Sequence, residues 1–464
     1  MITYAVLCPH PPLVIPEVGG DSINQVSRTV KGMQNLSREV FASEPDVVVF
    51  LTPHGNVFTD CLSCLTEEVL QGDLGNFGRR DLRYSRRNDL AFVKELQIRS
   101  GEQGMDLLGI NESFAHQHKL NAKLDHGIMV PLDYLEKAGL KNQAVVAISV
   151  GLLDPLDLYR FGKLIQETAA NLHRRVAIVA SGDMSHRLKE EGHYHYHPDA
   201  SRFDHLVQDS LAKADVEGML EIPSDLREHA GECGYPSIVI MLGTLDGYEI
   251  QSKVFSYEGP FGVGYLTAGL QADQKTDSVL ETLRKKKTAF IREKRGQESA
   301  AVKWARLNLE HRITGKAQPA LEGDMQQLLQ QKSAMFVSIK KNGKLRGCIG
   351  TFLPVYENLA EEIKHNALSA GLQDPRFPTV EADELSSLVY SVDLLTEPEP
   401  CTREDLDPKK YGVIVSRGSK RGLLLPDLEG VDTVEEQLLI ALQKAGISHR
   451  EKYQIERFQV KRFV

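Results

Sequence analysis

Residues 46–54 read DVVVFLTPH, a continuous apolar run that ends in proline and His54. An unbroken run of β-branched and large apolar residues favours a strand that is buried on both faces, as strands of parallel sheets are. Helical segments with apolar residues on one side occur at residues 22–44 and 154–173. This alternation of strand and helix predicts an α/β domain with a mostly parallel sheet flanked by helices. Three further runs resemble residues 46–54: residues 2–8 (ITYAVLC), 143–151 (QAVVAISVG) and 175–182 (RVAIVASG).

A histidine follows three of these four predicted strands within a few residues of the strand end. His10 follows AVLCP, His54 follows VVVFLTP and His186 follows VAIVASGDMS. In open α/β sheets, ligands bind in the crevice outside the carboxyl ends of the strands, so imidazoles aimed there can converge. We therefore expect either a metal site or an acid–base site at this edge of the sheet.

Imidazole suits iron, zinc and copper, and a metal site of this kind calls for a further ligand. Glu232 precedes a helix-like apolar run, so it can face the same crevice from the start of a helix. Cys233 is its rival, and a thiolate would shift the preference towards softer metals such as Cu(I) or zinc. The residues leave both candidates open. His126, in KLDHGIMVPL, is a fourth candidate histidine, and Asp125 before it is placed to flank a helix.

Two other groups of histidines are interpreted as polar loops. The segment FAHQHKL (residues 114–120) holds His116 and His118, and the segment EGHYHYHPDA (residues 191–200) holds three more. Alternate histidines would share one side of a strand, but neither segment has the pattern of one. We do not assign a second metal site to them.

Composition describes a soluble globular protein and excludes several classes. The chain has 464 residues, of which 41% are hydrophobic and 26% charged, and its formal net charge is -9 at pH 7. The length favours two or three domains, and the modest charge argues against a dedicated nucleic-acid surface. The N-terminal apolar stretch is too short for a signal peptide, and no run is long enough to span a bilayer. We expect a cytoplasmic protein that binds neither nucleic acid nor membranes, and a homo-oligomer is among the assemblies left open.

The character of the sequence changes near residue 273. We assign residues 1–272 to the first domain, residues 273–296 to a charged linker or connecting helix, and residues 297–464 to a smaller α+β domain. The elements expected in this second domain are helices at residues 298–315, 354–371 and 433–446, strands at 386–395 and 411–418, and a hairpin at 334–352 with its turn at KNGK.

Cys348 is a candidate catalytic thiol in the second domain. It lies in LRGCIG close to Arg346, and a nearby cation favours the thiolate. Free cysteine is also among the most buried residue types, so a packing role is the alternative. Asp374, Arg376 and His365 are its expected companions in a cleft, or else cap and surface residues.

Five segments together resemble the class III extradiol dioxygenase catalytic subunit family, the LigB-like or protocatechuate 4,5-dioxygenase type, and its relatives the Memo proteins. They are CPHPPL, LTPHGN, LDHGIMVPL, SGDMSHRL and GECGYPSIVIMLGTL, and they span residues 1 to about 270 in the family's order. The resemblance implies an Fe(II) ion held by His10, His54 and Glu232. It also implies that His186 is the acid–base residue and that His126 lies near bound dioxygen or the substrate.

One departure from the dioxygenase pattern concerns the third ligand. Memo-type sequences place a cysteine before a glycine in this segment, so Cys233 is the alternative to Glu232. Another divalent metal or copper is then an alternative to iron, and ring cleavage becomes doubtful.

Residues 297–464 resemble the AMMECR family. The similarity is carried by SIKKNGKLRGCIGTF, LQDPRFPTV, LVYSVDLLTEPEP and YGVIVSRGSKRGLLLPDLEGVDT, of which LRGCIG is the most specific part. Fusion of the two domains looks like the AmmeMemoRadiSam system, whose third component is a radical-SAM enzyme. The resemblance therefore implies a radical-SAM protein as a partner.

Three functions follow from these observations. The first is a dioxygenase-like oxidoreductase that uses non-haem iron on a small aromatic or phenolic substrate. The second is a Memo-like metal-binding component that works with the radical-SAM partner in a modification reaction without ring cleavage. The third is a metal-binding or scaffold protein without catalysis.

Overall fold

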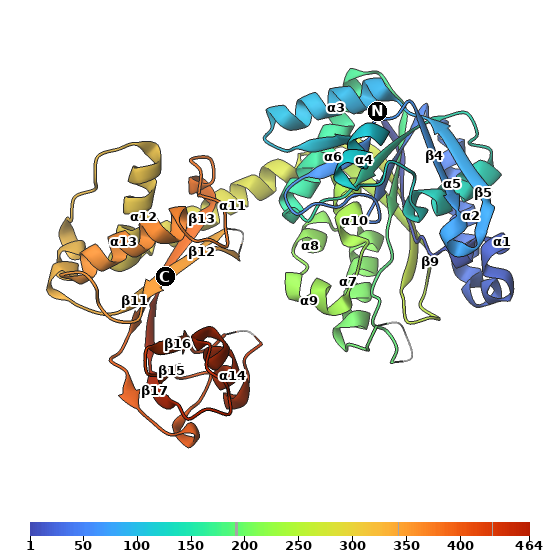
Figure 1. The fold of residues 1–464 in the computed structure, drawn as a ribbon. Coiled ribbons are helices and arrows are strands. Elements are labelled where there is room, and N and C mark those ends of the chain that lie inside the picture. Colours follow the sequence, from blue (N-terminus) through green and yellow to red (C-terminus); the bar gives the residue numbers. More distant parts are fainter. Residues whose placement is uncertain (191–193, 342, 429) are drawn as a thin grey trace. The chain divides into compact units, whose positions relative to one another are not determined.

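The computed structural model describes residues 1–190, 194–341, 343–428 and 430–464 (Figure 1). The chain divides into two compact units, Met1–Leu283 and Arg284–Val464. Helix α11 (Val279–Gly296) contains the boundary between them. With the last residues of strand β10 (Tyr265–Lys275), it occupies the segment expected to connect the domains, so the connection is mostly helical.

The first unit is built on an eight-stranded sheet, in which the four strands predicted from the sequence are the central ones. Strands β7, β2, β8 and β1 run parallel to one another. This group is flanked by β3 and β10, which run antiparallel to it. The predicted mostly parallel sheet is thus confirmed. In sheet order the strands are β6 (Leu107–Ile110), β3 (Leu62–Leu65), β7 (Ala144–Ser149), β2 (Val47–Thr52), β8 (Val176–Ser181), β1 (Ile2–Cys8), β10 and β9 (Tyr248–Glu258).

Helices cover both faces of this sheet. Val49 and Leu51 of β2 pack into one core, whereas Val48 and Phe50 pack into another on the opposite face. Because successive residues of a strand point to opposite faces, a strand covered on both sides is apolar throughout. Helices α3 (Leu90–Glu102), α6 (Pro155–Asn171), α7 (Asp199–Lys213) and α10 (Tyr235–Gly243) contribute to the first core, and α2 (Ser27–Ala42) and α5 (His126–Ala138) to the second.

Shorter elements complete the first unit. They are α1 (Pro16–Gly19), the β4 (Val69–Leu74) and β5 (Arg79–Arg87) hairpin, α4 (Glu112–His118), α8 (Val216–Leu220) and α9 (Ser224–Ala230). His116 and His118 therefore lie in a helix, so the interpretation of residues 114–120 as a loop was wrong. Across the described part of the chain, none of the helices combines the length and the apolar composition needed to cross a membrane.

The register of the parallel strands brings three strand ends to the same level. Cys8 of β1 lies opposite Ser181 of β8, and Leu51 of β2 lies opposite Ala180. The residues that follow β1, β2 and β8 therefore enter one crevice at the carboxyl edge of the sheet.

The second unit contains two antiparallel four-stranded sheets, which confirms the smaller α+β domain. Helices α12 (Ala300–Thr314) and α13 (Leu359–Leu372) pack on the first sheet around the buried Trp304, and α14 (Val434–Ala445) packs on the second. The predicted hairpin forms, although Asn342 in its turn lies outside the described residues. The sheets are β12 (Lys344–Thr351), β11 (Met335–Lys341), β13 (Leu388–Leu395) and β18 (Val460–Phe463), and β14 (Glu399–Pro400), β17 (Gln454–Phe458), β15 (Gly412–Arg417) and β16 (Lys420–Leu424).

Helices α6 and α10 cross closely because glycines lie at the crossing. A Cβ atom added at Gly162 of α6 would lie 2.0 Å from the main-chain oxygen of Ile240 in α10. Main-chain atoms cannot move aside as a flexible side chain can, so the helices would have to separate. Their separation would loosen the core that the two helices share on this face of the sheet.

We expect Gly162→Ala to lower the free energy of unfolding by about 1–3 kcal/mol, as overpacked sites do. Urea unfolding followed by circular dichroism measures this change. Gly101→Ala in α3 is the matched control, because nothing lies within 4 Å of its Cβ position. It should leave stability unchanged or raise it by up to about 1 kcal/mol, since alanine favours helix. Equal stability of the Gly162→Ala variant and the wild type would contradict the close crossing.

Candidate metal centre

His10 is held rigidly just after β1. Pro9 and Pro11 restrict the backbone on either side of it, and only 2% of the residue is exposed. Its main-chain N–H donates to Asp183 Oδ1 at 3.1 Å, and its Nδ1 lies 2.8 Å from Ser181 Oγ at the end of β8. Since Nδ1 is engaged by the hydroxyl, Nε2 is the nitrogen that faces the neighbouring histidines.

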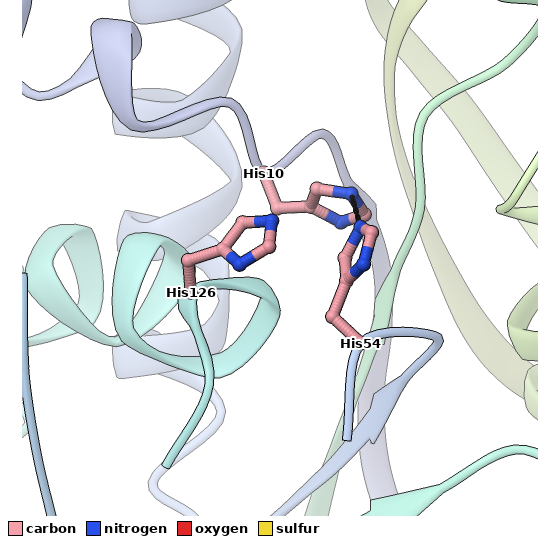
Figure 2. A group of neighbouring side chains, drawn as sticks. All are labelled: His10, His54 and His126. Atoms are coloured by element: carbon pink, nitrogen blue, oxygen red, sulfur yellow. Dashed lines mark hydrogen bonds between the residues drawn. The ribbon is translucent and has the colours of Figure 1, made fainter. Parts of the chain in front are cut away.

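His54 and His126 complete a group of three imidazoles (Figure 2). His54 follows β2, and its Nε2 lies 2.8 Å from His10 Nε2. His126 is the first residue of α5, and its ring centroid lies 4.2 Å from that of His54 and 5.4 Å from that of His10. One nitrogen of each ring lies within 4.8 Å of the others. His126, which was predicted to lie near bound dioxygen or the substrate, thus lies in the same group as the predicted metal ligands His10 and His54.

The position of His126 depends on the cap of α5. Asp125 accepts hydrogen bonds from the Gly127 N–H at 2.8 Å and from Thr52 Oγ1 at 2.7 Å. The first bond caps the helix, and the second ties the cap to the last residue of β2. Asp125 therefore flanks the helix as expected and also fixes it to the strand that carries His54.

Partial desolvation and mutual repulsion keep the three imidazoles uncharged at neutral pH, although only His10 is fully buried, His126 is partly exposed and His54 is exposed. Burial lowers the pKa of His10 well below its ordinary value, and the neighbouring His54 and His126 lower it further. Burial, followed by the repulsion from His126, lowers the pKa of His54 to about 4, and burial lowers the pKa of His126 as well. Neutral imidazoles carry the lone pairs that a metal ion requires.

Cys233 lies beside this group. Its Sγ is 3.7 Å from His10 Nε2 and accepts the Asp183 N–H at 3.3 Å. Burial, with a contribution from Asp183, raises the pKa of the thiol well above its ordinary value. The sulfur is therefore a thiol until a cation approaches, and a metal ion favours its deprotonation.

Glu232 bonds to the main chain at the start of α10. Its Oε2 accepts the Tyr235 N–H at 2.7 Å at the start of α10, and it is not part of the three-histidine group. Burial raises the pKa of its carboxyl to about 7. Cys233 thus contacts His10, whereas Glu232 bonds to the main chain of Tyr235. Neither residue belongs to the three-histidine group, and the ligand roles of both stay predictions.

Asp183 is a residue of the site that sequence reasoning did not single out. Its Oδ2 lies 3.8 Å from His10 Nε2, and burial raises its pKa to about 7. A signal was available, because Asp183 follows β8 by two residues in SGDMSH, the same spacing that singled out His10 after β1 and His54 after β2.

His186 lies at the margin of the group. It contributes to lowering the pKa of both His10 and His54, which places it within electrostatic range of them. Its main-chain N–H donates to Ala230 O at 3.0 Å, and its ring meets that of Tyr194 edge-on at 5.5 Å. Burial lowers the pKa of His186, so its imidazole is neutral near pH 7 and can accept a proton.

A second set of potential ligands occurs elsewhere in the unit. His197, Asp199 and His229 lie with ligand atoms within 4.8 Å of one another, and all three are partly exposed. His229 Nδ1 is 2.9 Å from Asp199 Oδ2, whereas His197 Nδ1 accepts the Asp199 N–H at 3.2 Å. Because that bond occupies the Nδ1 lone pair, we assign no metal here. His193 of the same segment lies outside the described residues.

Cys348 lies in the second unit and belongs to a different site. Its main-chain N–H donates to Asp374 Oδ2 at 2.9 Å, and Arg376 donates to its carbonyl at 2.8 Å. Two of the three expected companions are therefore next to it. His365 instead stacks on Tyr356, with ring centroids 4.1 Å apart.

Comparison with known proteins agrees with this architecture. Residues 4–268 match the family described as the catalytic LigB subunit of aromatic ring-opening dioxygenase, and residues 302–463 match AMMECR1. Protein CA_C1420 of Clostridium acetobutylicum is 40% identical over 463 residues, which is 98% of each chain. A Thermotoga maritima protein is 51% identical over 170 residues, 36% of this chain and 98% of that one. The crystal structure of uncharacterised protein PH0010 from Pyrococcus horikoshii is 29% identical and covers 35% of this chain and 88% of its own, with a TM-score of 0.33.

The fold therefore defines an α/β protein of the dioxygenase-like class, with a candidate metal site at its histidine group. The chain belongs to the family of the catalytic LigB subunit of aromatic ring-opening dioxygenases, and it carries an AMMECR1 domain behind that unit. This confirms the resemblance of both parts to their families.

The lowered pKa of His54 gives a pH prediction for the metal-free protein. With chelator present, His54 should titrate near pH 4 instead of near 6.5. The unfolded chain then binds more protons than the folded one between these values, so stability should fall as the pH drops from 6.5 towards 4. Nuclear magnetic resonance of protein labelled with ¹⁵N-histidine reports the titration. Assignment rests on His54→Gln, with the exposed His116→Gln as the control. A His54 midpoint near pH 6.5 would contradict the packing of the group.

Proposed function

We propose that this chain is a metal-dependent enzyme that binds a small phenolic or other aromatic molecule at the carboxyl edge of its parallel sheet. The metal site is built from His10, His54 and Cys233, with His126 beside them. The observation that carries the proposal is the 3.7 Å between Cys233 Sγ and His10 Nε2, next to three imidazoles whose nitrogens lie within 4.8 Å of one another.

The donor set fits a transition metal ion. Neutral imidazole suits iron, zinc and copper, whereas a thiolate adds preference for softer ions. Fe(II) is the first candidate because of the family, with zinc and copper as the competitors that the sulfur favours. His10 Nε2 and His54 Nε2 lie 2.8 Å apart with lowered pKa values, an arrangement in which an ion would take both lone pairs. When bound, the ion would act as a Lewis acid towards an oxygen of the substrate.

The residues around the site hold and orient it. Ser181 Oγ fixes the ring of His10 through Nδ1, which sets the direction of Nε2. Asp125 holds α5, and with it His126, against the end of β2. His186 is neutral near pH 7 and is the residue that we assign to take the phenolic proton and return it.

Ring-opening dioxygenase activity is the second candidate function, and family membership favours it. It would use Glu232 in place of Cys233, with Oε1 as the oxygen left free by the bond from the Tyr235 N–H to Oε2. Under the first candidate, the reaction is a modification without ring cleavage, and the radical-SAM partner belongs to that proposal. A non-catalytic metal-binding role would need neither a substrate nor the proton transfer assigned to His186.

Substitutions at the two rival ligands separate these candidates. Loss of a residue that only hydrogen-bonds to a metal ligand lowers metal affinity by roughly 10–100-fold. We expect Cys233→Ser, which removes a ligand itself, to lower the affinity by more than this, and Glu232→Gln to retain the metal. His10→Ala and His54→Ala should lose it. Anaerobic loading with Fe(II) followed by elemental analysis measures this, and thiolate-to-metal absorption of the Co(II)-substituted protein tests the sulfur directly.

Cys61→Ser, at a partly buried thiol outside the group, is the matched control for Cys233→Ser. Metal loss in Glu232→Gln together with retention in Cys233→Ser would overturn the thiolate site and favour the dioxygenase. Oxygen uptake by the wild type with catechols, without any partner, would point the same way.

His186→Gln tests the acid–base assignment. Glutamine keeps much of the size and polarity of histidine but cannot carry the proton. We expect the variant to bind metal as the wild type does and to lose turnover of a phenolic substrate by about 10²-fold or more. Metal analysis and steady-state rates are measured on the same samples. Unchanged turnover would remove the catalytic role of His186 and favour a binding function.

A further inference from the structure

A cavity of about 800 Å³ lies in the second unit, and no residue of the histidine group lines it. Its walls come from both sheets of the unit and from helices α11 and α14. A volume of this size is typical of pockets that enclose small organic molecules. The cavity is therefore large enough to be a second binding site, separate from the metal centre.

Part of the cavity wall is apolar. Leu388 and Leu423 are buried, Phe336 is partly buried, and the exposed side chains of Leu345 and Phe352 also line it. Apolar and aromatic walls of this kind take up the hydrocarbon part of a ligand. Contact with these walls alone would not discriminate between charged and neutral ligands.

The charged part of the wall is mostly cationic. Seven lysine and arginine side chains line the cavity against three carboxylates, those of Glu298, Asp393 and Asp427. The arginines are paired, for example Arg462 with Asp393 at 2.8 Å and Arg376 with Asp374 at 2.7 Å. The lysines thus provide the excess of positive charge.

Lys444 of α14 is one of the three lysines that line the cavity. Among the described residues no carboxylate pairs with it, and its electrostatic neighbours are the Arg376 guanidinium and the Cys348 thiol. Burial, then Arg376, lowers the pKa of Lys444, and Cys348 offsets part of this. Lys444 thus adds a positive charge beside the Arg376–Asp374 pair, and a cation at a partly apolar wall attracts an anion.

Three residues that line the cavity also carry buried polar atoms without a hydrogen-bond partner in the described structure. They are the hydroxyl of Tyr390, a residue that is 1% exposed, and the Nε atoms of Arg295 and Arg421. A buried donor left unsatisfied costs about 1–3 kcal/mol. Because these atoms are themselves buried, a molecule in the cavity reaches them only if nearby side chains move.

We propose that this cavity binds a small organic anion with an apolar, aromatic-sized body and a carboxylate, phosphate or sulfonate group. The apolar body lies against Phe336 and Leu423, and the anionic group is held by Lys444 beside Arg376. Cys348 lies at the same wall, where its Sγ accepts a hydrogen bond from Ser338 at 3.2 Å. A bound anion therefore covers the thiol.

The test uses 8-anilinonaphthalene-1-sulfonate as the anionic probe and N-phenyl-1-naphthylamine as its uncharged counterpart. Fluorescence titration of the full chain should show tighter binding of the sulfonate, weakened by added salt. Lys444→Met keeps the apolar stem and removes the charge, so it should weaken sulfonate binding about tenfold and leave the uncharged probe unaffected. Lys444→Arg should restore the affinity. Lys452→Met, at an exposed lysine outside the cavity, is the matched control.

Alkylation of Cys348 by iodoacetamide, read by mass spectrometry, locates the probe. The sulfonate should slow alkylation of Cys348 but not of Cys401, a partly buried thiol of the same unit outside the cavity. The proposal would be overturned if Lys444→Met bound each probe as tightly as the wild type does. It would also be overturned if saturating sulfonate left Cys348 unprotected from alkylation. His10→Ala should bind the sulfonate normally, which separates this result from the fate of the metal centre.

Discussion

The parallel register of β1, β8 and β2 is the constraint on which the candidate metal centre depends. Pairing of Cys8 with Ser181 and of Leu51 with Ala180 ends three neighbouring strands at one level. Each strand is covered on both faces, so a shift of register would move every apolar side chain to the wrong core. The positions of His10 and His54 are therefore fixed by the hydrophobic energy of the whole sheet and not by contacts of the histidines themselves.

Hydrogen bonds at these strand ends set the directions in which the side chains of the site point. Ser181 ends β8 and engages the ring of His10, and Thr52 ends β2 and engages Asp125, the cap of α5. The Asp183 carboxylate accepts the main-chain N–H of His10, and the main-chain N–H of Asp183 donates to Cys233 Sγ. Each strand thus holds a residue supplied by another element, which is how segments more than 170 residues apart in the chain meet in one site.

The two sites use electrostatics in opposite ways. In the first unit, desolvation removes the charge from the imidazoles, so that lone pairs converge without repulsion and suit a cation. In the second unit, Lys444 is exposed enough to stay charged and lies within range of Arg376, so that positive charge accumulates at a partly apolar wall and suits an anion.

The sequence by itself determined the strands, the main helices and the edge at which histidines gather. Apolar runs report burial on both faces, and a residue just past the end of a parallel strand has nowhere to lie but that edge. Local pattern failed for residues 114–118, where Asn111 caps a short helix in a polar stretch, and it passed over Asp183. Tertiary structure alone gave the adjacent Glu232 and Cys233 different contacts, because the turn before α10 and its packing against β8 bring one side chain to the Tyr235 N–H and the other to His10. It also decided that Cys348, Arg376 and Lys444 share one cavity, since the strands and helices that carry them are brought together only by the packing of two separate sheets.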